Sequence, residues 1–347
     1  MNLLPVSMFL AFVVGFSAHR AGVCTVAAVA ELRSTRQARL FISFLKTILW
    51  ILLISKLLLL WHPELARPWQ VDSGIWLALA GGFIFGVGAT VNGGCGFSTI
   101  SKLAQGNLHL AFTLPAFMAG VKTALYTLPA SAPTGLATLV LPFTLNQVAR
   151  WLLFAALVAW AVRELILILA PVIKSRRLLP SLFANRYRLS TGAALIGISG
   201  GLLYAINGKW AYSSLLVQTV TGRNSSHSVS PDIAVYLFIA LLAGAVFSAV
   251  SGRRFRFSFA GDQWTRNLAG GFLMGFGAMM VPGGNSALIL QGLPQLSLHA
   301  ITAYPAMVLG ILITMRIIEQ YTGKALYVSC SRDQCRVEKP EAESNIP

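Results

Sequence analysis

Long apolar stretches, separated by short polar or basic segments, fill almost the whole chain. A helix needs about 20 mostly apolar residues to cross the hydrocarbon core of a bilayer. Nine stretches meet this length, near residues 3–32, 40–61, 74–105, 109–128, 147–172, 190–221, 232–251, 264–292 and 299–318. The pattern predicts an all-α polytopic membrane protein with about nine transmembrane helices.

Four of these stretches, the first, third, sixth and eighth, are too long for one simple helix and contain a glycine-rich break. We expect each to be a broken helix, or a helix followed by a short re-entrant helix. In three of them the same spacing separates a glycine from the residue that follows the break. These pairs are Gly15 and Cys24, Gly86 and Cys95, and Gly201 and Trp210.

The fourth copy needs one inserted residue, near Pro282, to bring Asn285 opposite Cys95. Each half of the chain then holds four stretches in the same order: a long broken one, an unbroken one, a second long broken one and a second unbroken one. Four crossings plus one connecting crossing turn the second half upside down, so the pattern predicts two inverted repeats. The alternative is that glycine-rich helices resemble each other by composition, since small residues are common at helix contacts in membranes.

Composition agrees with the membrane prediction. Of 347 residues, 56% are apolar and 11% are charged, and the mean hydropathy is +0.69. These values exclude an ordinary water-soluble domain. The first stretch has no basic region before it and no small-residue cleavage site after it, so we interpret it as a retained span.

The net charge of +16 does not indicate a nucleic-acid partner, because Lys and Arg lie in short clusters between apolar stretches. Clusters near 33–39, 174–188 and 253–266 fall on one side of the predicted membrane, together with the segment after 316. The loops on the opposite side carry little or no charge. The positive-inside rule therefore places the N-terminus outside and the C-terminus in the cytoplasm, with the lipid bilayer as partner.

Domain boundaries follow from the repeats and loops. We expect a first membrane repeat at 1–128, a connecting loop and helix at 129–173, a basic cytoplasmic loop at 174–189, a second membrane repeat at 190–321 and a cytoplasmic tail at 322–347. The tail carries Cys330 and Cys335, but a lone C-x4-C is a weak metal signal. We expect a flexible end without a disulfide framework.

The breaks favour an anionic ligand. The residues after each break can begin a short helix whose free N–H groups and positive dipole end point at the break. Such a terminus is suited to an anion. Gly94 and Gly284 allow close approach of the backbone, and Ser98 and Ser286 add hydroxyl donors.

Ionisable residues inside the apolar stretches are few and mostly basic. Arg20, Lys122 and Lys209 lie there with almost no acidic partner. Charges at such depth usually mark a pathway. The balance favours an anionic solute over a metal ion or proton–cation exchange, and we expect no metal and no cofactor.

Cys24 and Cys95 take the same position in two copies of the break. A buried thiol is often only a small apolar filler, but its repetition favours a place on the path. A thiol is a weak hydrogen-bond donor. It is therefore suited to a large, polarisable acceptor such as the terminal sulfur of thiosulfate.

Three motifs carry a resemblance that covers the whole chain: HRAGVCT around Cys24, GATVNGGCGFSTISKLAQG around Cys95 and GGFLMGFGAMMVPGGNSALI around Asn285. The chain resembles the YeeE/YedE family of sulfur transport membrane proteins, whose characterised members take up thiosulfate. The resemblance implies a nine-span, hourglass-shaped protein of the inner membrane, in which thiosulfate is handed along cysteines, here Cys24 and Cys95. It also implies a cytoplasmic sulfur-carrier partner of the TusA type.

The family's third cysteine, in the last copy of the break, is absent, and Gly284 and Asn285 stand in its place. An amide can donate two hydrogen bonds to an oxyanion but offers no thiol. We expect a transporter or channel-like permease for a small sulfur-containing anion, thiosulfate first, or a different sulfur or selenium oxyanion. Two further hypotheses stay open: a thiol-based redox or sulfur-transferring membrane enzyme, and a non-transporting membrane subunit that binds a partner.

Overall fold

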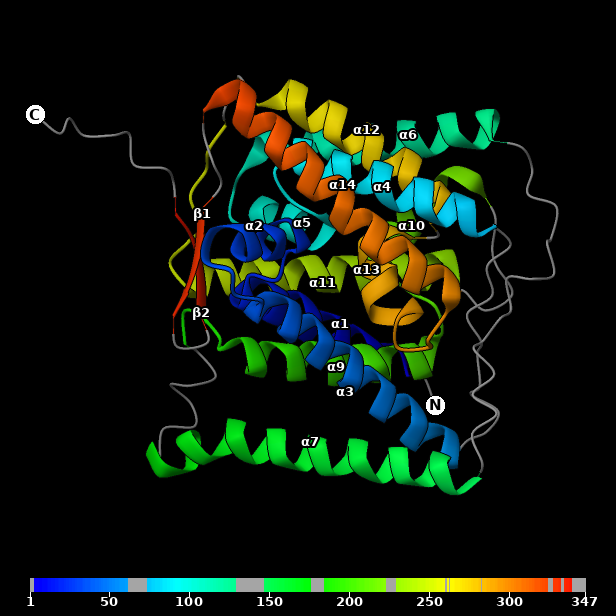
Figure 1. Ribbon diagram of the computed structural model, residues 1–347, viewed down its shortest axis with the longest axis vertical. Helices are drawn as coiled ribbons and strands as arrows, with labels where there is room; N and C mark the ends of the chain where they lie inside the picture. Colours follow the sequence, from blue (N-terminus) through cyan, green and yellow to red (C-terminus); the bar gives the residue numbers. More distant parts are fainter. Residues whose placement is uncertain are drawn as a thin grey trace, which may run out of the picture.

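The computed structural model describes residues 3–61, 74–128, 147–175, 184–222, 229–259, 261, 263–281, 283–323, 327–331 and 334–338. Within this part of the chain, almost all residues are helical (Figure 1). Among the described residues, eight helical segments are long and apolar enough to cross a membrane, and the number rises to nine if a bent pair near residue 282 is one span. The prediction of an all-α membrane protein with about nine crossings is confirmed.

The helical elements lie within a few residues of the predicted stretches. In chain order they are α1 (Leu4–Ala21), α2 (Thr25–Thr35), α3 (Arg39–Trp61), α4 (Ile75–Val91), α5 (Gly96–Ala104), the 3-10 turn η2 (Leu108–Phe112), α6 (Thr113–Thr127), α7 (Gln147–Ser175), α9 (Leu189–Asn207), α10 (Tyr212–Thr221), α11 (Pro231–Ser251), α12 (Trp264–Met280), α13 (Gly284–Ala287), the π-helical turn η3 (Leu288–Gly292) and α14 (Leu298–Thr322). Residues 129–146 of the predicted connecting segment and residues 176–183, half of the predicted basic loop, lie outside the described residues.

All four long stretches break where glycines occur. In the first half, Gly22 and Gly93 adopt positive φ angles of 64° and 77°, a conformation that other residues rarely tolerate. The chain then leaves α1 and α4 and restarts as the short helices α2 and α5. Cys24 and Cys95 are the residues immediately before these two helices.

One part of the predicted spacing is wrong. Cys24 and Cys95 are the residues immediately before α2 and α5, but the residue immediately before α10 is Ala211. Trp210 therefore lies one residue too early in the chain to match the two cysteines. The cause is one additional residue between the positive-φ glycine of this break, Gly208, and the start of the short helix.

Glycine faces allow the long helices to touch backbone to backbone. A Cβ at Gly275 on α12 would lie 1.9 Å from the Phe117 carbonyl oxygen of α6. A Cβ at Gly86 on α4 would lie 2.2 Å from the Met307 carbonyl oxygen of α14. The contacts α4–α14 and α6–α12 thus correspond between the two halves, as do α1–α11 and α3–α9. The inverted repeat that would produce this correspondence stays a prediction.

The short helices α2, α5, α10 and α13 lie in the middle of the bundle, among the long helices (Figure 1). Helix α7 lies at its edge and exposes most of its surface. Lys46 on α3 pairs with Glu164 on α7 and donates to Ser190 on α9, which fixes this outer helix to the bundle. The second embedded acid, Glu31, accepts the N–H groups of Arg39 and Leu40 and thereby caps the start of α3.

The C-terminal segment departs from the prediction of a flexible end. Two strands, β1 (Tyr327–Ser331) and β2 (Gln334–Glu338), form an antiparallel hairpin beside α2. Val328 is fully buried, and Ser34 donates to its carbonyl oxygen at 2.9 Å. Cys330 is disulfide-bonded and lies opposite Cys335 in the strand register, which corrects the expectation of no disulfide. The prediction for 339–347 concerns residues outside the described part.

The close contact at Gly275 yields a stability prediction. We expect Gly275→Ala to lower the free energy of unfolding by about 1–3 kcal/mol, because the added methyl group forces α12 away from α6. Gly200→Ala on α9 is the matched control, since its Cβ would meet only side-chain atoms at 3.6 Å and beyond. Thermal unfolding in detergent measures both variants. Equal stability of the two would contradict the contact.

Candidate functional site

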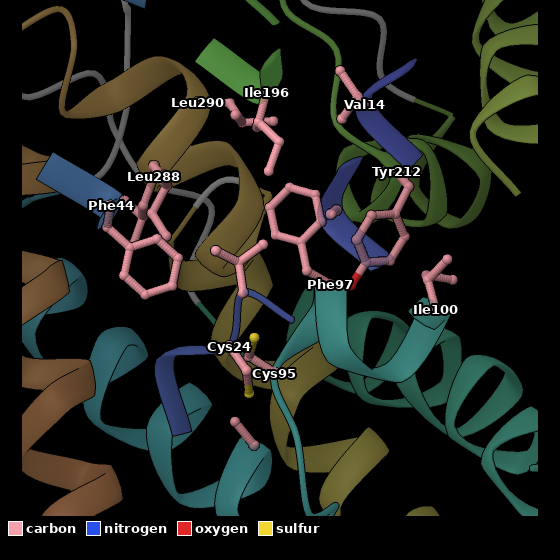
Figure 2. Packing of buried hydrophobic residues seen from close by; sticks show 14 of the residues in the cluster. Val14, Cys24, Phe44, Cys95, Phe97, Ile100, Ile196, Tyr212, Leu288 and Leu290 are labelled. Carbon is pink, nitrogen blue, oxygen red and sulfur yellow. The ribbon is translucent and has the colours of Figure 1, made fainter. Parts of the chain in front are cut away.

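Two thiols meet where α1 and α4 break. Cys24 and Cys95 are 7% and 1% exposed, and both are free cysteines. Their side chains interact directly, and their sulfur atoms lie side by side in Figure 2. The two cysteines, called here the thiol pair, are 71 positions apart in the sequence, and the breaks bring them together.

Backbone N–H groups surround the thiol pair. The N–H groups of Cys95 and Ala27 point at the sulfur of Cys24. Those of Thr25 and Ser98 point at the sulfur of Cys95. Each sulfur thus receives N–H groups from the first turns of both α2 and α5. The two helices present their positive ends to one point, which favours negative charge there.

Two tyrosines, neither of them predicted from the sequence, border the thiol pair. The Tyr212 hydroxyl of α10 packs against the backbone of Gly96, directly after Cys95. The Tyr212 ring lies against Phe97, with 6.4 Å between the centroids (Figure 2). The Tyr304 hydroxyl of α14 lies beside Thr25 and close to both thiols. A tyrosine within an apolar helix carries no sequence signal of such a position.

Asn285 lies in the same region. It is 1% exposed, and Thr25 donates to its carbonyl oxygen Oδ1 at 3.2 Å. Its amide nitrogen Nδ2 is buried without a hydrogen-bond partner. The neighbouring Gly284 has a φ angle of 62° and packs against the Phe85 ring, while Ser286 shares a hydrogen bond of 2.6 Å with Ser213.

A cavity of about 280 Å³ adjoins Cys24 and Ser98. Four cations, Arg20, Lys102, Arg186 and Arg254, are among the residues that line it, and we call it the basic cavity. Neither Asp nor Glu occurs among the described residues of its wall. The balance of charge therefore suits an anion that enters or leaves beside Cys24.

Arg20 and Lys102 are held in place at the wall of the basic cavity. Arg20 is 2% exposed, donates to Ser248 and Ser251, and stacks over the Phe16 ring at 4.6 Å. Lys102 donates to the carbonyl oxygen of Gly93 at 2.6 Å and so stabilises the break before Cys95. Lys102 was not predicted as a site residue, because from the sequence it is only one more lysine near a helix end.

Three predicted site residues lie elsewhere. Lys122 is exposed on the outer face of α6, whose buried residues face the other way. Lys209 is half-buried in the break between α9 and α10. Trp210 is buried and donates to the carbonyl oxygen of Ala234 at 3.3 Å. None of the three is among the residues that line the basic cavity.

Gly94 is buried in the turn before Cys95, where a Cβ would lie 2.7 Å from the Ser98 hydroxyl oxygen. The structure thus brings Cys24, Cys95, Gly94 and Ser98 together. Asn285 joins them through Thr25.

Comparison with known protein families gives a match over most of the chain. Residues 20–313 match a family model described as "Sulphur transport". The match includes both cysteines of the thiol pair and Asn285, and it ends before the C-terminal hairpin. A comparison with curated proteins finds no match.

The contact within the thiol pair can be tested by oxidation. In a chain carrying Cys330→Ser and Cys335→Ser, only Cys24 and Cys95 remain of the four cysteines. We expect diamide to convert them into an intramolecular disulfide, because their side chains are already in contact. Mass spectrometry after alkylation under denaturing conditions counts the remaining thiols. If both stay fully alkylated after oxidation, the thiols are not neighbours.

Proposed function

Because the chain belongs to the sulphur transport family, we propose that it is a permease for a small sulfur-containing anion, with thiosulfate as substrate. The anion passes the thiol pair in the middle of the bundle. One observation carries the proposal: two free thiols lie in contact where the N-termini of two helices converge. The transport function follows from the family, and thiosulfate is our inference from the chemistry of the site.

The thiol pair suits the sulfur end of thiosulfate. A thiol is a weak donor, and the terminal sulfur of thiosulfate is a large, polarisable acceptor. The N–H groups of α2 and α5 and their positive helix ends stabilise the negative charge of the anion during passage. A fully oxygenated anion would gain less from thiols, which gives the path a preference for sulfur.

The basic cavity is the proposed exit. It adjoins Cys24 and is lined by Arg186 before α9 and Arg254 after α11, both in segments that the positive-inside rule places in the cytoplasm. We therefore propose an inner-membrane protein with its N-terminus outside and its C-terminus in the cytoplasm. We propose a TusA-type sulfur carrier, as the family resemblance implies, as the cytoplasmic partner that binds at this end.

We also propose that the two halves are inverted repeats. The corresponding glycine contacts support this: a Cβ at Gly88 would lie 2.6 Å from the Met274 nitrogen, and one at Gly277 would lie 2.7 Å from the Phe85 nitrogen. The corresponding breaks then point at the centre from opposite sides. Such a pair of broken repeats builds a substrate site near the midplane of many transporters.

Uptake of sulfur-35-labelled thiosulfate into proteoliposomes tests the proposal. We expect Cys24→Ala and Cys95→Ala each to lower the uptake rate about tenfold or more, since each removes a group that contacts the anion. Cys330→Ala is the matched control, because Cys330 lies in the hairpin, and it should keep the wild-type rate.

Each result has a separate meaning. Absence of thiosulfate uptake by correctly inserted wild-type protein would refute the substrate. Conversion of thiosulfate by the thiol pair without uptake would favour a sulfur-transferring membrane enzyme. Equal rates for all three cysteine variants would remove the thiol pair from the path.

A further inference from the structure

We infer that Asn285 and Tyr304 form an oxyanion subsite that orients the substrate at the thiol pair. The subsite binds the oxygen atoms of the anion, while Cys24 and Cys95 face its terminal sulfur. This inference rests on the proposed function and assigns the specificity of the same site.

The first support is a buried amide with an unused donor. Buried polar groups in proteins are nearly always hydrogen-bonded, and exceptions call for an explanation. Asn285 is 1% exposed, yet its Nδ2 has no partner. Thr25 donates to Oδ1 of the same amide, which directs Nδ2 away from Thr25. The amide therefore holds two N–H donors ready for an acceptor.

The second support is the Tyr304 hydroxyl. It is buried beside the Thr25 side chain without a well-formed hydrogen bond, and it lies close to both thiols. The side chains of Asn285 on α13 and Tyr304 on α14 thus both contact one residue of α2, Thr25. Thr25 directly follows Cys24, so both side chains lie next to the thiol pair.

The chemistry of the two kinds of donor is different. An amide N–H and a phenolic O–H bind small oxygen acceptors well, and such bonds are strengthened when the acceptor is charged. Thiols are weak donors and favour the large sulfur atom. Thiosulfate carries both kinds of acceptor at its two ends. A site with both kinds of donor therefore holds it in one orientation.

This division also explains how the chain functions without a third cysteine. Asn285 stands where the family resemblance implies a thiol, and it supplies oxygen-binding N–H groups there. The chain thus keeps two thiols for the sulfur end and uses the third position for the oxygen end. Affinity depends on both ends, and discrimination against sulfate depends on the thiols.

Competition against labelled thiosulfate uptake tests the inference in proteoliposomes at pH 8. The unlabelled competitors are thiosulfate, sulfite, which offers oxygen acceptors without a terminal sulfur, and thiocyanate, which offers a polarisable sulfur without oxygen. The variants are Tyr304→Phe, which removes one hydroxyl, and Asn285→Leu, which keeps the approximate size and the neutral charge but removes the N–H donors. Tyr321→Phe on the same helix is the control, because Tyr321 is 87% exposed.

We expect Tyr304→Phe and Asn285→Leu to weaken inhibition by sulfite and by thiosulfate about tenfold, and to leave inhibition by thiocyanate unchanged. Cys95→Ala should show the opposite selectivity, with thiocyanate weakened and sulfite unchanged. A merely structural role would weaken all three competitors equally.

The outcomes separate this inference from the proposed function. Equal loss for all three competitors, or no loss in Tyr304→Phe and Asn285→Leu, overturns the oxyanion subsite while thiosulfate transport stands. Failure of the wild-type protein to take up thiosulfate overturns the proposed function and this inference with it.

Discussion

The need to satisfy backbone polar groups inside an apolar bundle governs this structure. Every helix break in a membrane exposes N–H and C=O groups that must find a partner in protein or in an aqueous path. Here the N–H groups at the starts of α2 and α5 meet the sulfur atoms of Cys24 and Cys95. The positive-φ glycines Gly22 and Gly93 make the breaks possible. The same breaks therefore create the thiol pair and its electropositive surroundings.

The distribution of charge follows from the same arrangement. Two buried or nearly buried acids have structural partners, since Glu31 caps α3 and Glu164 pairs with Lys46. A third, Glu319, pairs with Arg33. The described wall of the basic cavity contains no carboxylate, and Arg20 and Lys102 are fixed there by neutral oxygen acceptors. A cavity of this charge, next to polarisable thiols, combines the two properties that a sulfur-containing anion requires.

Much of the fold was predictable because bilayer thickness sets the length of a span and glycine marks a break. The thiol pair was predictable because both cysteines repeat at one position. Contacts between elements far apart in the sequence were not predictable. Tyr304, for example, borders the thiol pair only because of how α14 packs. Lys122 is the opposite case. Its position inside an apolar stretch predicted a place on the path, but the residue lies on the exposed face of α6. The hairpin is held by the burial of Val328 beside α2. The polar sequence of the tail gives no signal of this contact.

The central claim is that the anion rests between two thiols at the converging ends of α2 and α5. Selenosulfate, in which selenium replaces the terminal sulfur, allows this to be located directly. Anomalous diffraction from crystals soaked in selenosulfate should place the selenium atom in contact with the sulfur atoms of Cys24 and Cys95. A selenium peak confined to the basic cavity, with none at the thiol pair, would contradict the account.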